Sequence, residues 1–421
     1  MDKFVITGGK RLSGQVEVSG AKNASLALMP ACILASGTSV LYNTPELNDV
    51  YTMIKLINFL GVETSFKDHT LSINTANITS QEAPYEYVKK MRASVYVLGP
   101  LLGKFGSAKV SLPGGCAWGP RPINLHIEGL KKMGAEIELA EGYIIAKCKK
   151  LTGAKINFDV SSVGATANIL MAAVLAKGTT IINNAAMEPE ITNLAEFLVK
   201  MGAKINGINQ SILEIEGIDE LKPAAMETIP DRIEAGTLLI AAAITRGEIT
   251  LKNISPKYIQ SILNKLEDSG CTVENKNGDI YLNGVNNGIN PSNVTTAIYP
   301  GFPTDMQAQW TAYMSIANGT ATVTDTIYFD RFKHVPELLR LGANITVTDN
   351  VALVKGISKL HGAKVMSTDL RASASLVLAG LAAEGKTEVL RVYHLDRGYQ
   401  KIEAKLKSLG ADIERVEGKE F

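Results

Sequence analysis

An α/β fold of two domains, each built from three β-α-β-α-β-β repeats with buried helices, is predicted by two sets of recurring glycines and by a helical run without a polar face. Each glycine of the first set ends an apolar run and precedes a β-rich run, at intervals of 69, 72, 69, 72 and 66 residues: Gly37, Gly106, Gly178, Gly247, Gly319 and Gly385. The second set recurs at intervals of 73, 68, 68, 72 and 68 residues: Gly61, Gly134, Gly202, Gly270, Gly342 and Gly410. Two independent markers with one period indicate a sixfold repeat.

The third repeat shows how one unit is built. Residues 166–178 are apolar nearly all round, which predicts a buried helix that Gly178 ends. A strand follows, then a second helix that stops at Gly202, then a hairpin that turns at Asn209 and Gln210. Because the first helix has no polar face, the sheets must lie outside and enclose it, which inverts the usual α/β layering.

Six repeats in 421 residues predict two domains of three repeats each. A plausible hinge is the segment 226–231, which contains a proline. We expect one domain to span 22–229 and the other to join 1–21 to 230–421, because residues 3–19 resemble the missing closing strands of a repeat. Since clefts between domains are common small-molecule sites, the functional residues are expected where the two halves face each other.

The composition excludes several classes of protein. The formal net charge is +1, which gives no overall attraction to nucleic acid or to an anionic membrane. No run approaches the ~20 apolar residues of a membrane helix, and the first residues lack the apolar stretch of a signal peptide. The four cysteines form no CxxC pair and the five histidines no HExxH pattern, so no metal site or disulfide framework is indicated. We expect a cytoplasmic protein with reduced thiols.

Candidate functional residues emerge when the repeats are aligned. The positions 14 or 15 residues before the first set of glycines are Lys22, Arg92, Val163 or Gly164, Arg232, Asp305 and Arg371. Each position begins the first helix of a repeat, where an acidic or small polar residue is normally preferred. Four basic residues in six places indicate a site for a polyanion, to which the small residues of SSVGAT in repeat three would add backbone N–H groups. The alternative is a set of solvated first-turn side chains.

The loops before the second helices supply further candidates. The segment 113–122 is rich in glycine and proline, which predicts a long loop of the kind that closes over a site, and it carries Cys116 and Arg121. An arginine near the thiol would lower the pKa of the cysteine and make it reactive. Equivalent loops carry Arg331 and Arg397. The other cysteines lie in apolar or strand-like runs, which is typical of core filling: Cys32, Cys148 and Cys271.

The segment GLAAEGKT at 380–387 matches the phosphate-loop pattern, but we interpret the match as accidental. The motif requires a strand before it and a helix after it, whereas here a helix precedes and a strand follows.

Eight segments together resemble a known family. They are SGAKNASL at 19–26, MRASVYVLGPL at 91–101, LPGGCAWGPRPINLH at 112–126, SVGAT at 162–166, FPTDMQAQ at 302–309, RFKHVPEL at 331–338, LRASASLVLAG at 370–380 and HLDRGY at 394–399. They are similar to the UDP-N-acetylglucosamine 1-carboxyvinyltransferases, members of the EPSP synthase superfamily, over essentially the whole chain. The resemblance implies an inside-out α/β barrel with six repeats in two domains.

The resemblance also implies an activity. The family transfers the enolpyruvyl group of phosphoenolpyruvate to the 3-hydroxyl of UDP-N-acetylglucosamine and releases phosphate, the committed step of bacterial peptidoglycan precursor synthesis. No metal or organic cofactor is implied, and the expected partners are the two substrates, with neither nucleic acid nor membrane. By the same resemblance Cys116 donates a proton to C3, forms a covalent adduct with phosphoenolpyruvate and is the residue that fosfomycin alkylates, and Asp305 is the general base.

The remaining roles implied by the resemblance concern substrate binding. Lys22, Arg121 and Arg397 would hold the phosphate of phosphoenolpyruvate, with Asn23 beside Lys22. Residues implied in contacts with the sugar nucleotide are Arg92, Arg121, Pro122, Ile123, Asn124, Leu125, Ser162, Val163, Gly164 and Ile327. Arg331 and Arg371 complete the substrate-binding set, as counter-charge for the carboxylate and phosphoryl groups.

Two positions depart from the family pattern. Asn124 stands where the uridine-binding stretch is expected to have Asp, and Val160 stands where some relatives have Lys near the diphosphate. Asn keeps an acceptor oxygen but loses the charge, so these changes bear on nucleotide affinity rather than on the reaction.

Two alternatives remain open at the level of the sequence. A 5-enolpyruvylshikimate-3-phosphate synthase-like transferase would share the basic residues but lack the GGCxxGxRP loop. A non-catalytic sugar-nucleotide-binding paralogue would not need Lys22, Cys116, Asp305 and Arg397 together.

Overall fold

The computed structural model describes residues 2–89, 91–112, 123–276, 278–284, 288–328 and 330–417. The chain forms two compact units. One, the continuous unit, spans residues 20–229, and the other, the split unit, joins residues 1–19 to 230–421. The first boundary lies two residues before the one expected from the sequence.

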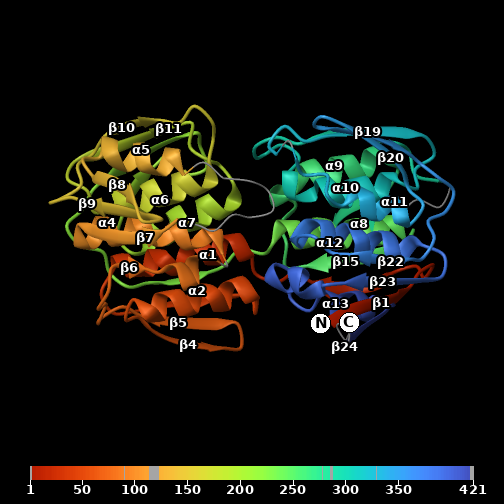
Figure 1. Ribbon diagram of the computed structural model, residues 1–421, viewed down its shortest axis with the longest axis horizontal. Helices are drawn as coiled ribbons and strands as arrows, with labels where there is room; N and C mark the ends of the chain where they lie inside the picture. Colours follow the sequence, from red (N-terminus) through yellow and green to blue (C-terminus); the bar gives the residue numbers. More distant parts are fainter. Residues whose placement is uncertain are drawn as a thin grey trace. The chain divides into compact units, whose positions relative to one another are not determined.

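The continuous unit contains three repeats (Figure 1). Its helices are α1 (Lys22–Ala31), α2 (Asn48–Phe59), α3 (Tyr85–Val88), α4 (Leu98–Phe105), α5 (Asn124–Lys132), α6 (Val163–Ala173) and α7 (Pro189–Lys200), with short 3-10 helices η1 (Cys32–Leu34) and η2 (Arg92–Val97). Its strands are β3 (Thr38–Tyr42), β4 (Glu63–Lys67), β5 (Thr70–Asn74), β6 (Glu82–Ala83), β7 (Ser107–Ser111), β8 (Glu136–Ala140), β9 (Tyr143–Lys147), β10 (Lys155–Asn157), β11 (Thr179–Asn183), β12 (Lys204–Asn206), β13 (Ile212–Glu216) and β14 (Ala225–Glu227).

The split unit begins with strands β1 (Asp2–Thr7) and β2 (Ser13–Glu17). Its helices are α8 (Arg232–Ile244), α9 (Gln260–Asp268), α10 (Gln307–Met314), α11 (Val335–Arg340), α12 (Leu370–Ala382) and α13 (Ile402–Ser408), with η3 (Pro256–Tyr258), η4 (Thr304–Met306) and η5 (Val392–Arg397). Its other strands are β15 (Glu248–Lys252), β16 (Thr272–Lys276), β17 (Asp279–Asn283), β18 (Val294–Thr295), β19 (Thr320–Thr324), β20 (Asn344–Thr348), β21 (Val351–Lys355), β22 (Lys364–Met366), β23 (Lys386–Leu390) and β24 (Asp412–Glu417).

Each repeat corresponds to one four-stranded sheet with a parallel pair at one edge and two antiparallel pairings. The third repeat supplies all four strands of its own sheet, in the order β10-β11-β13-β12. The first repeat borrows its opening strand, β14, from the end of the same unit. In the split unit β1 pairs with β23 and β24 and closes the sixth repeat, as expected. The expectation for β2 was wrong in detail, because it runs parallel to β15 and opens the fourth repeat.

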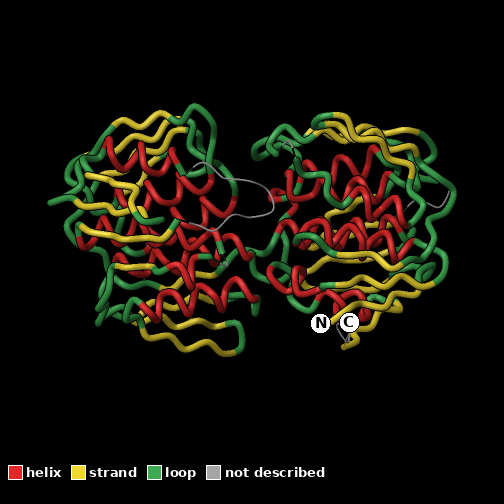
Figure 2. Tube along the Cα trace, viewed as in Figure 1, coloured by secondary structure: helices red, strands yellow, loops and turns green. Residues whose placement is uncertain are grey.

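The first helix of each repeat lies inside its unit, and the sheets lie outside (Figure 2). Every residue of α6 from Ala165 to Ala173 is buried, as is every residue of α8 from Ile233 to Ile244. Each unit has its own apolar core around these helices. The prediction of enclosed helices in an inverted α/β layering is therefore confirmed.

The two sets of glycines have different roles. All six members of the second set have a φ between 90° and 108° and follow the last residue of a helix by two positions, which confirms them as helix stops. In the first set only Gly106 caps a helix directly. The expectation that Gly178 ends a helix was wrong, because α6 ends at Ala173. The carbonyl of Val174 accepts from the N–H of Ile218 instead of continuing the helix, and Gly178 leads into β11.

Two glycines in buried helices offer a matched test of how tightly the helices pack. A Cβ added at Gly99 in α4 would lie 2.3 Å from the backbone oxygen of Asn168 in α6, which has no freedom to move. A Cβ at Gly236 in α8 would instead meet the ends of the Ile262 and Met306 side chains at 2.9 Å. We expect Gly99→Ala to destabilise the protein by about 2–3 kcal/mol or more, and Gly236→Ala by less than about 1 kcal/mol.

Urea denaturation midpoints of both variants and of the unmodified chain would measure this difference. Equal midpoints for the two variants would show that the backbones of α4 and α6 move apart as readily as the side chains of Ile262 and Met306 change conformation.

Candidate functional site

The candidate residues fall into two groups, one in each unit. The continuous unit holds Lys22, Asn23, Arg92, Ile123, Asn124, Leu125, Ser162, Val163 and Gly164. The split unit holds Asp305, Ile327, Arg331, Arg371 and Arg397. Cys116, Arg121 and Pro122 lie outside the described residues.

Lys22 is the first residue of α1, whose start has neither a side-chain cap nor an acidic first turn. Its Nζ lies 3.4 Å from Oδ2 of Asp49, a buried acid in the first turn of α2. Asp49 is a partner that sequence reasoning missed, although an acid at the start of the second helix of a repeat is a visible signal. Asn23, the neighbour of Lys22, is exposed. The ammonium group is thus held at a helix start, where it adds to the positive end of the helix dipole.

Arg92 begins η2, which leads into α4. Its Nη2 is buried and has no hydrogen-bond partner in the described part of the chain. A buried guanidinium nitrogen without an acceptor is costly, and an anionic ligand would satisfy it.

The start of α6 is arranged differently from the basic helix starts. The hydroxyl of Ser162 caps the helix by accepting from the N–H of Ala165 at 3.3 Å. Among the described residues, the N–H groups of Val163 and Gly164 meet no hydrogen-bond acceptor. These small residues therefore present backbone donors at a helix N-terminus, as the sequence indicated.

His126 packs beside this helix start. A Cβ on Gly164 would lie 3.1 Å from Nε2 of His126. Asn168 accepts from the N–H of Gly99 at 2.8 Å and donates to the carbonyl of Val95, so its amide also donates to Nδ1 of His126. Nδ1 is thus an acceptor and Nε2 carries the proton. Burial lowers the pKa of His126 to about 4, which keeps the ring neutral.

Val160 and the first described residues after position 122 differ in exposure. Leu125 is buried, Ile123 is partly buried, and Asn124 is the exposed first residue of α5. Val160, at the other departure from the family pattern, is 63% exposed.

Asp305 is the centre of the group in the split unit. It lies in η4, directly before α10, and both of its carboxylate oxygens are bound by arginine. Nη2 of Arg331 donates to Oδ1 at 2.7 Å, and Nη2 of Arg371 donates to Oδ2 at 2.8 Å. Arg371, in the first turn of α12, is 4% exposed, and its guanidinium lies over the ring of Tyr399. The sequence pointed to all three residues but not to their direct contact.

The electrostatics of this cluster follow from the two ion pairs. Burial would raise the pKa of Asp305, but Arg371 and Arg331 outweigh it and hold that pKa well below its ordinary value of 3.8. Burial works against the charged form of Arg371, yet Asp305 raises its pKa. Burial, together with the charge of Arg331, lowers the pKa of the neighbouring His334 to about 3. The cluster is one carboxylate between two permanent cations, with a net positive charge.

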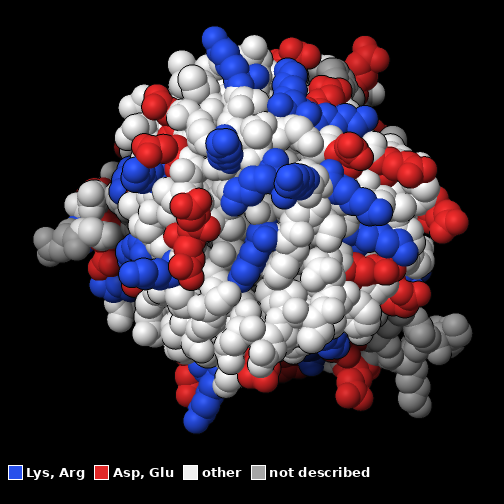
Figure 3. All heavy atoms as spheres, turned by 90° about the vertical axis from the view of Figure 1, so that its left-hand side faces the viewer, with Lys and Arg blue, Asp and Glu red and all other residues white. Residues whose placement is uncertain are grey.

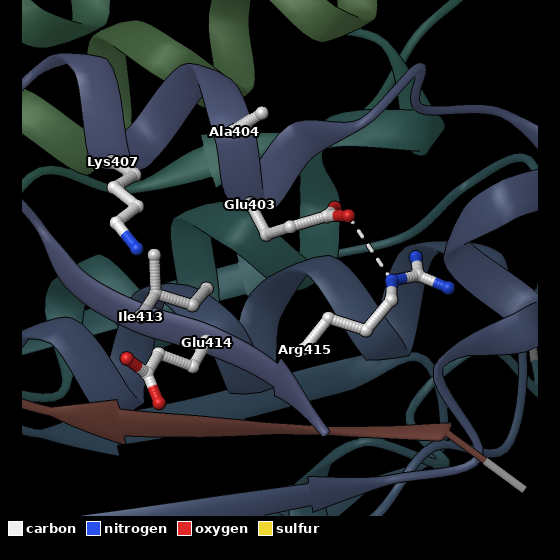
Figure 4. A pocket seen from close by; sticks show the side chains of 6 residues that line it. All are labelled: Glu403, Ala404, Lys407, Ile413, Glu414 and Arg415. Atoms are coloured by element: carbon white, nitrogen blue, oxygen red, sulfur yellow. Dashed lines mark hydrogen bonds and ion pairs between the residues drawn. The ribbon is translucent and has the colours of Figure 1, made fainter. Parts of the chain in front are cut away.

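Arg397 is the last residue of η5, and its position is supported through its neighbour Asp396. Arg415 of β24 pairs with Asp396, with Glu403 at 3.0 Å and with Asp2 at 3.1 Å. Figure 4 shows the Arg415–Glu403 pair in a surface pocket between α13 and β24. None of the candidate residues lines this pocket, so it is not the substrate site indicated by the sequence.

The three described cysteines have the settings of unreactive thiols. Burial raises the pKa of Cys32 to about 12, and burial also raises the pKa of Cys148. Cys271 is 6% exposed, with its Sγ 3.5 Å from the hydroxyl of Tyr313.

Charged side chains of both signs cover one face of the continuous unit. Figure 3 looks onto the continuous unit, where basic and acidic side chains are interspersed over the face drawn. Within the described ranges, no group of three or more His, Cys, Asp or Glu side chains is arranged to hold a metal ion. No helix in the described part of the chain is long and apolar enough to span a membrane.

The chain is similar to proteins of known family over its whole length. Residues 6–406 match the family model of EPSP synthase (3-phosphoshikimate 1-carboxyvinyltransferase). Proteins named UDP-N-acetylglucosamine 1-carboxyvinyltransferase are 61% identical in Chloroherpeton thalassium, covering 100% of this chain and 99% of that protein, and 57% identical in Chlorobium limicola, covering 100% of both. The relative of that name in Geotalea daltonii is 53% identical over 99% of this chain and 100% of its own.

Solved structures support the fold. The enolpyruvyl transferase NikO from Streptomyces tendae superposes with a TM-score of 0.90 at 24% identity, covering 99% of both chains. EPSP synthase from Acinetobacter baumannii superposes with a TM-score of 0.77 at 19% identity, covering 99% of this chain and 100% of its own. The fold is that of the enolpyruvyl transferases, an inside-out α/β barrel, and by its full-length similarity the chain belongs to the UDP-N-acetylglucosamine 1-carboxyvinyltransferase family.

Proposed function

We propose that this protein transfers the enolpyruvyl group of phosphoenolpyruvate to the 3-hydroxyl of UDP-N-acetylglucosamine and releases inorganic phosphate. The observation that carries the proposal is Asp305 held between Arg331 and Arg371. This cluster combines a proton acceptor with counter-charge for an anionic substrate, in a chain 53–61% identical to named transferases. The reaction would be the first committed step of peptidoglycan precursor synthesis, in the cytoplasm.

The reaction is an addition followed by an elimination. In the addition, the oxygen of the sugar 3-hydroxyl bonds to C2 of phosphoenolpyruvate, Asp305 takes the hydroxyl proton and Cys116 delivers a proton to C3. In the elimination, the bond from C2 to the phosphate oxygen breaks and C3 loses a proton, which restores the double bond. The addition needs one group that gives a proton to carbon and another that takes a proton from oxygen. The thiol of Cys116 and the carboxylate of Asp305 are assigned to these two tasks.

Because of its two ion pairs, the basicity of Asp305 would depend on whether substrate is bound. With both oxygens bound by guanidinium groups and a low pKa, Asp305 is a weak base. The carboxylate and phosphate of phosphoenolpyruvate would compete for Arg331 and Arg371. Once substrate charge offsets the arginines, the pKa of Asp305 rises toward the range in which it accepts a proton. The substrate would thereby activate the group that deprotonates its co-substrate.

The other cations are assigned to the remaining negative charges. We assign Lys22, Arg121 and Arg397 to the phosphate of phosphoenolpyruvate, with Asn23 beside it. Residues assigned to UDP-N-acetylglucosamine are Arg92, Arg121, Pro122, Ile123, Asn124, Leu125, Ser162, Val163, Gly164 and Ile327. The buried Nη2 of Arg92 and the backbone donors at the start of α6 support this assignment.

The assay that tests the function is phosphate release. We expect release with phosphoenolpyruvate and UDP-N-acetylglucosamine together, and none when shikimate 3-phosphate replaces the sugar nucleotide. Release with phosphoenolpyruvate and shikimate 3-phosphate, but not with phosphoenolpyruvate and the sugar nucleotide, would favour the second candidate, a 5-enolpyruvylshikimate-3-phosphate synthase, whose family model the chain also matches. Binding of the sugar nucleotide without release would indicate a non-catalytic protein.

Replacement of Asp305 by Asn tests both the base and the ion pairs. Turnover should fall by about 10²–10⁴-fold, because the amide cannot accept the proton. Stability should also fall by about 3 kcal/mol at pH 7, because the buried Arg371 and the partly buried Arg331 lose their shared counter-ion. The pKa of Asp305 is lower in the folded chain than its unfolded value of 3.8, so this contribution is present above about pH 4 and is lost at lower pH.

Phosphate release and urea midpoints at several pH values would measure these effects. A folded Asp305→Asn variant with near-normal kcat would remove Asp305 from the mechanism. A stability difference that grew on acidification would contradict the ion-pair account.

Labelling by a phosphonate epoxide tests the role of Cys116. We expect modification of Cys116 and not of Cys32, Cys148 or Cys271, and a faster rate when UDP-N-acetylglucosamine is present. Cys32 and Cys271 are buried and Cys148 is partly buried, and burial raises the pKa of Cys32 and of Cys148. Cys116→Asp should keep turnover and escape labelling, whereas Cys116→Ser should turn over much more slowly. Peptide mass spectrometry with and without the nucleotide reads out the result, and labelling spread over several cysteines would refute the assignment.

A further inference from the structure

Asp325 is a buried carboxylate that the reaction scheme leaves without a task. It directly follows β19, and its side chain is fully buried. In the described part of the chain no cation pairs with it. Four neutral hydrogen-bond donors stabilise the carboxylate instead. Burial of a carboxylate without a counter-ion costs free energy of folding unless each of these hydrogen bonds is made.

The four donors come from two places. The hydroxyl of Thr296 and the N–H groups of Ile327 and Tyr328 donate to Oδ1, at 2.8, 2.9 and 2.9 Å. The hydroxyl of Thr304 donates to Oδ2 at 2.7 Å. Asp325 therefore fixes the turn that carries Ile327 and, at the same time, the residue before Asp305.

The bond to Thr304 determines which way that hydroxyl points. An ionised carboxylate only accepts hydrogen bonds, and a hydroxyl has a single proton to give. Because the proton of Thr304 is given to Asp325, a lone pair of the same oxygen remains for Nη1 of Arg331, which donates to it at 2.8 Å. Nη2 of the same guanidinium donates to Asp305. A neutral amide at position 325 would not impose this direction.

We propose that Asp325 is a positioning residue of the transferase, which acts through the Thr304 hydroxyl to aim Arg331 at Asp305. The relay runs from Asp325 to Thr304, from Thr304 to Arg331 and from Arg331 to Asp305. It rests on the proposed function, because the Arg331–Asp305 pair is where that function places proton transfer. Asp325 itself does not touch the reacting atoms.

Thr296 provides a matched control for Thr304. Each threonine gives one hydroxyl bond to Asp325, but only Thr304 continues to Arg331. If Asp325 served stability alone, Thr296→Val and Thr304→Val would act alike. If it serves positioning, the two variants lose similar stability and differ in catalysis.

The experiment measures phosphate release against pH for Thr304→Val, Thr304→Ser, Thr296→Val and Asp325→Asn, with urea midpoints for each. We expect Thr304→Val and Asp325→Asn to lower kcat/KM for phosphoenolpyruvate by about tenfold or more. The acid limb of the pH profile of kcat/KM should move to higher pH in both variants. An Arg331 that is no longer held by Thr304 should depress the pKa of Asp305 less. Thr304→Ser, which keeps the hydroxyl, should stay close to the unmodified enzyme. Thr296→Val should keep the acid limb of the unmodified enzyme.

The outcomes are separable from a failure of the proposed function. If the unmodified chain releases no phosphate, the function itself is wrong. If it is active and Thr304→Val matches Thr296→Val in rate and pH profile, the relay is refuted. Should Thr304→Val not fold, the comparison of Asp325→Asn with Thr296→Val decides in the same way.

Discussion

Burial of the first helix of each repeat on every side is the constraint on which the rest of the structure depends. A helix enclosed by its neighbours and by an outer sheet carries mostly apolar side chains, and a polar one such as Asn168 of α6 must be hydrogen-bonded inside the unit. Charged groups that are to meet a ligand therefore collect where such a helix begins. That is where Lys22, Arg92, Asp305 and Arg371 stand. The fold thus concentrates charge at helix starts, where backbone N–H groups also point toward an anion.

The cluster around Asp305 shows how one carboxylate allows two guanidinium groups to lie close together and largely out of contact with water. Two buried or nearly buried guanidinium groups would be expensive alone, and the carboxylate makes them tolerable. Under the proposed mechanism, the same contact suppresses the basicity that Asp305 needs as a general base. A substrate with its own negative charge would then resolve both problems, because it would take over the counter-ion role and release the carboxylate.

The sequence could predict the repeat and the buried helices, because recurring glycines and apolar runs are local signals, and alignment of the repeats placed Lys22, Arg92 and Arg371 at helix starts, where the structure has them. The second set of glycines ended helices as expected, while Gly178 did not, since the carbonyl it would have served is taken by Ile218, forty residues further along the chain. Thr304 and Asp325 were beyond prediction for the same reason. Their significance lies in which oxygen faces which donor, and residues 304 and 325 are brought together only by the packing of η4 against the end of β19.

The pairing of β1 with β23 and β24 also has a consequence for the order of events during synthesis. The residues of the continuous unit are all available once position 229 has left the ribosome, and their sheets are complete among themselves. β1 is made before the continuous unit, whereas its partners β23 and β24 are made after it. Until these partners are available, the backbone N–H and C=O groups of β1 are unpaired, so β1 reaches its place only after the continuous unit has been made.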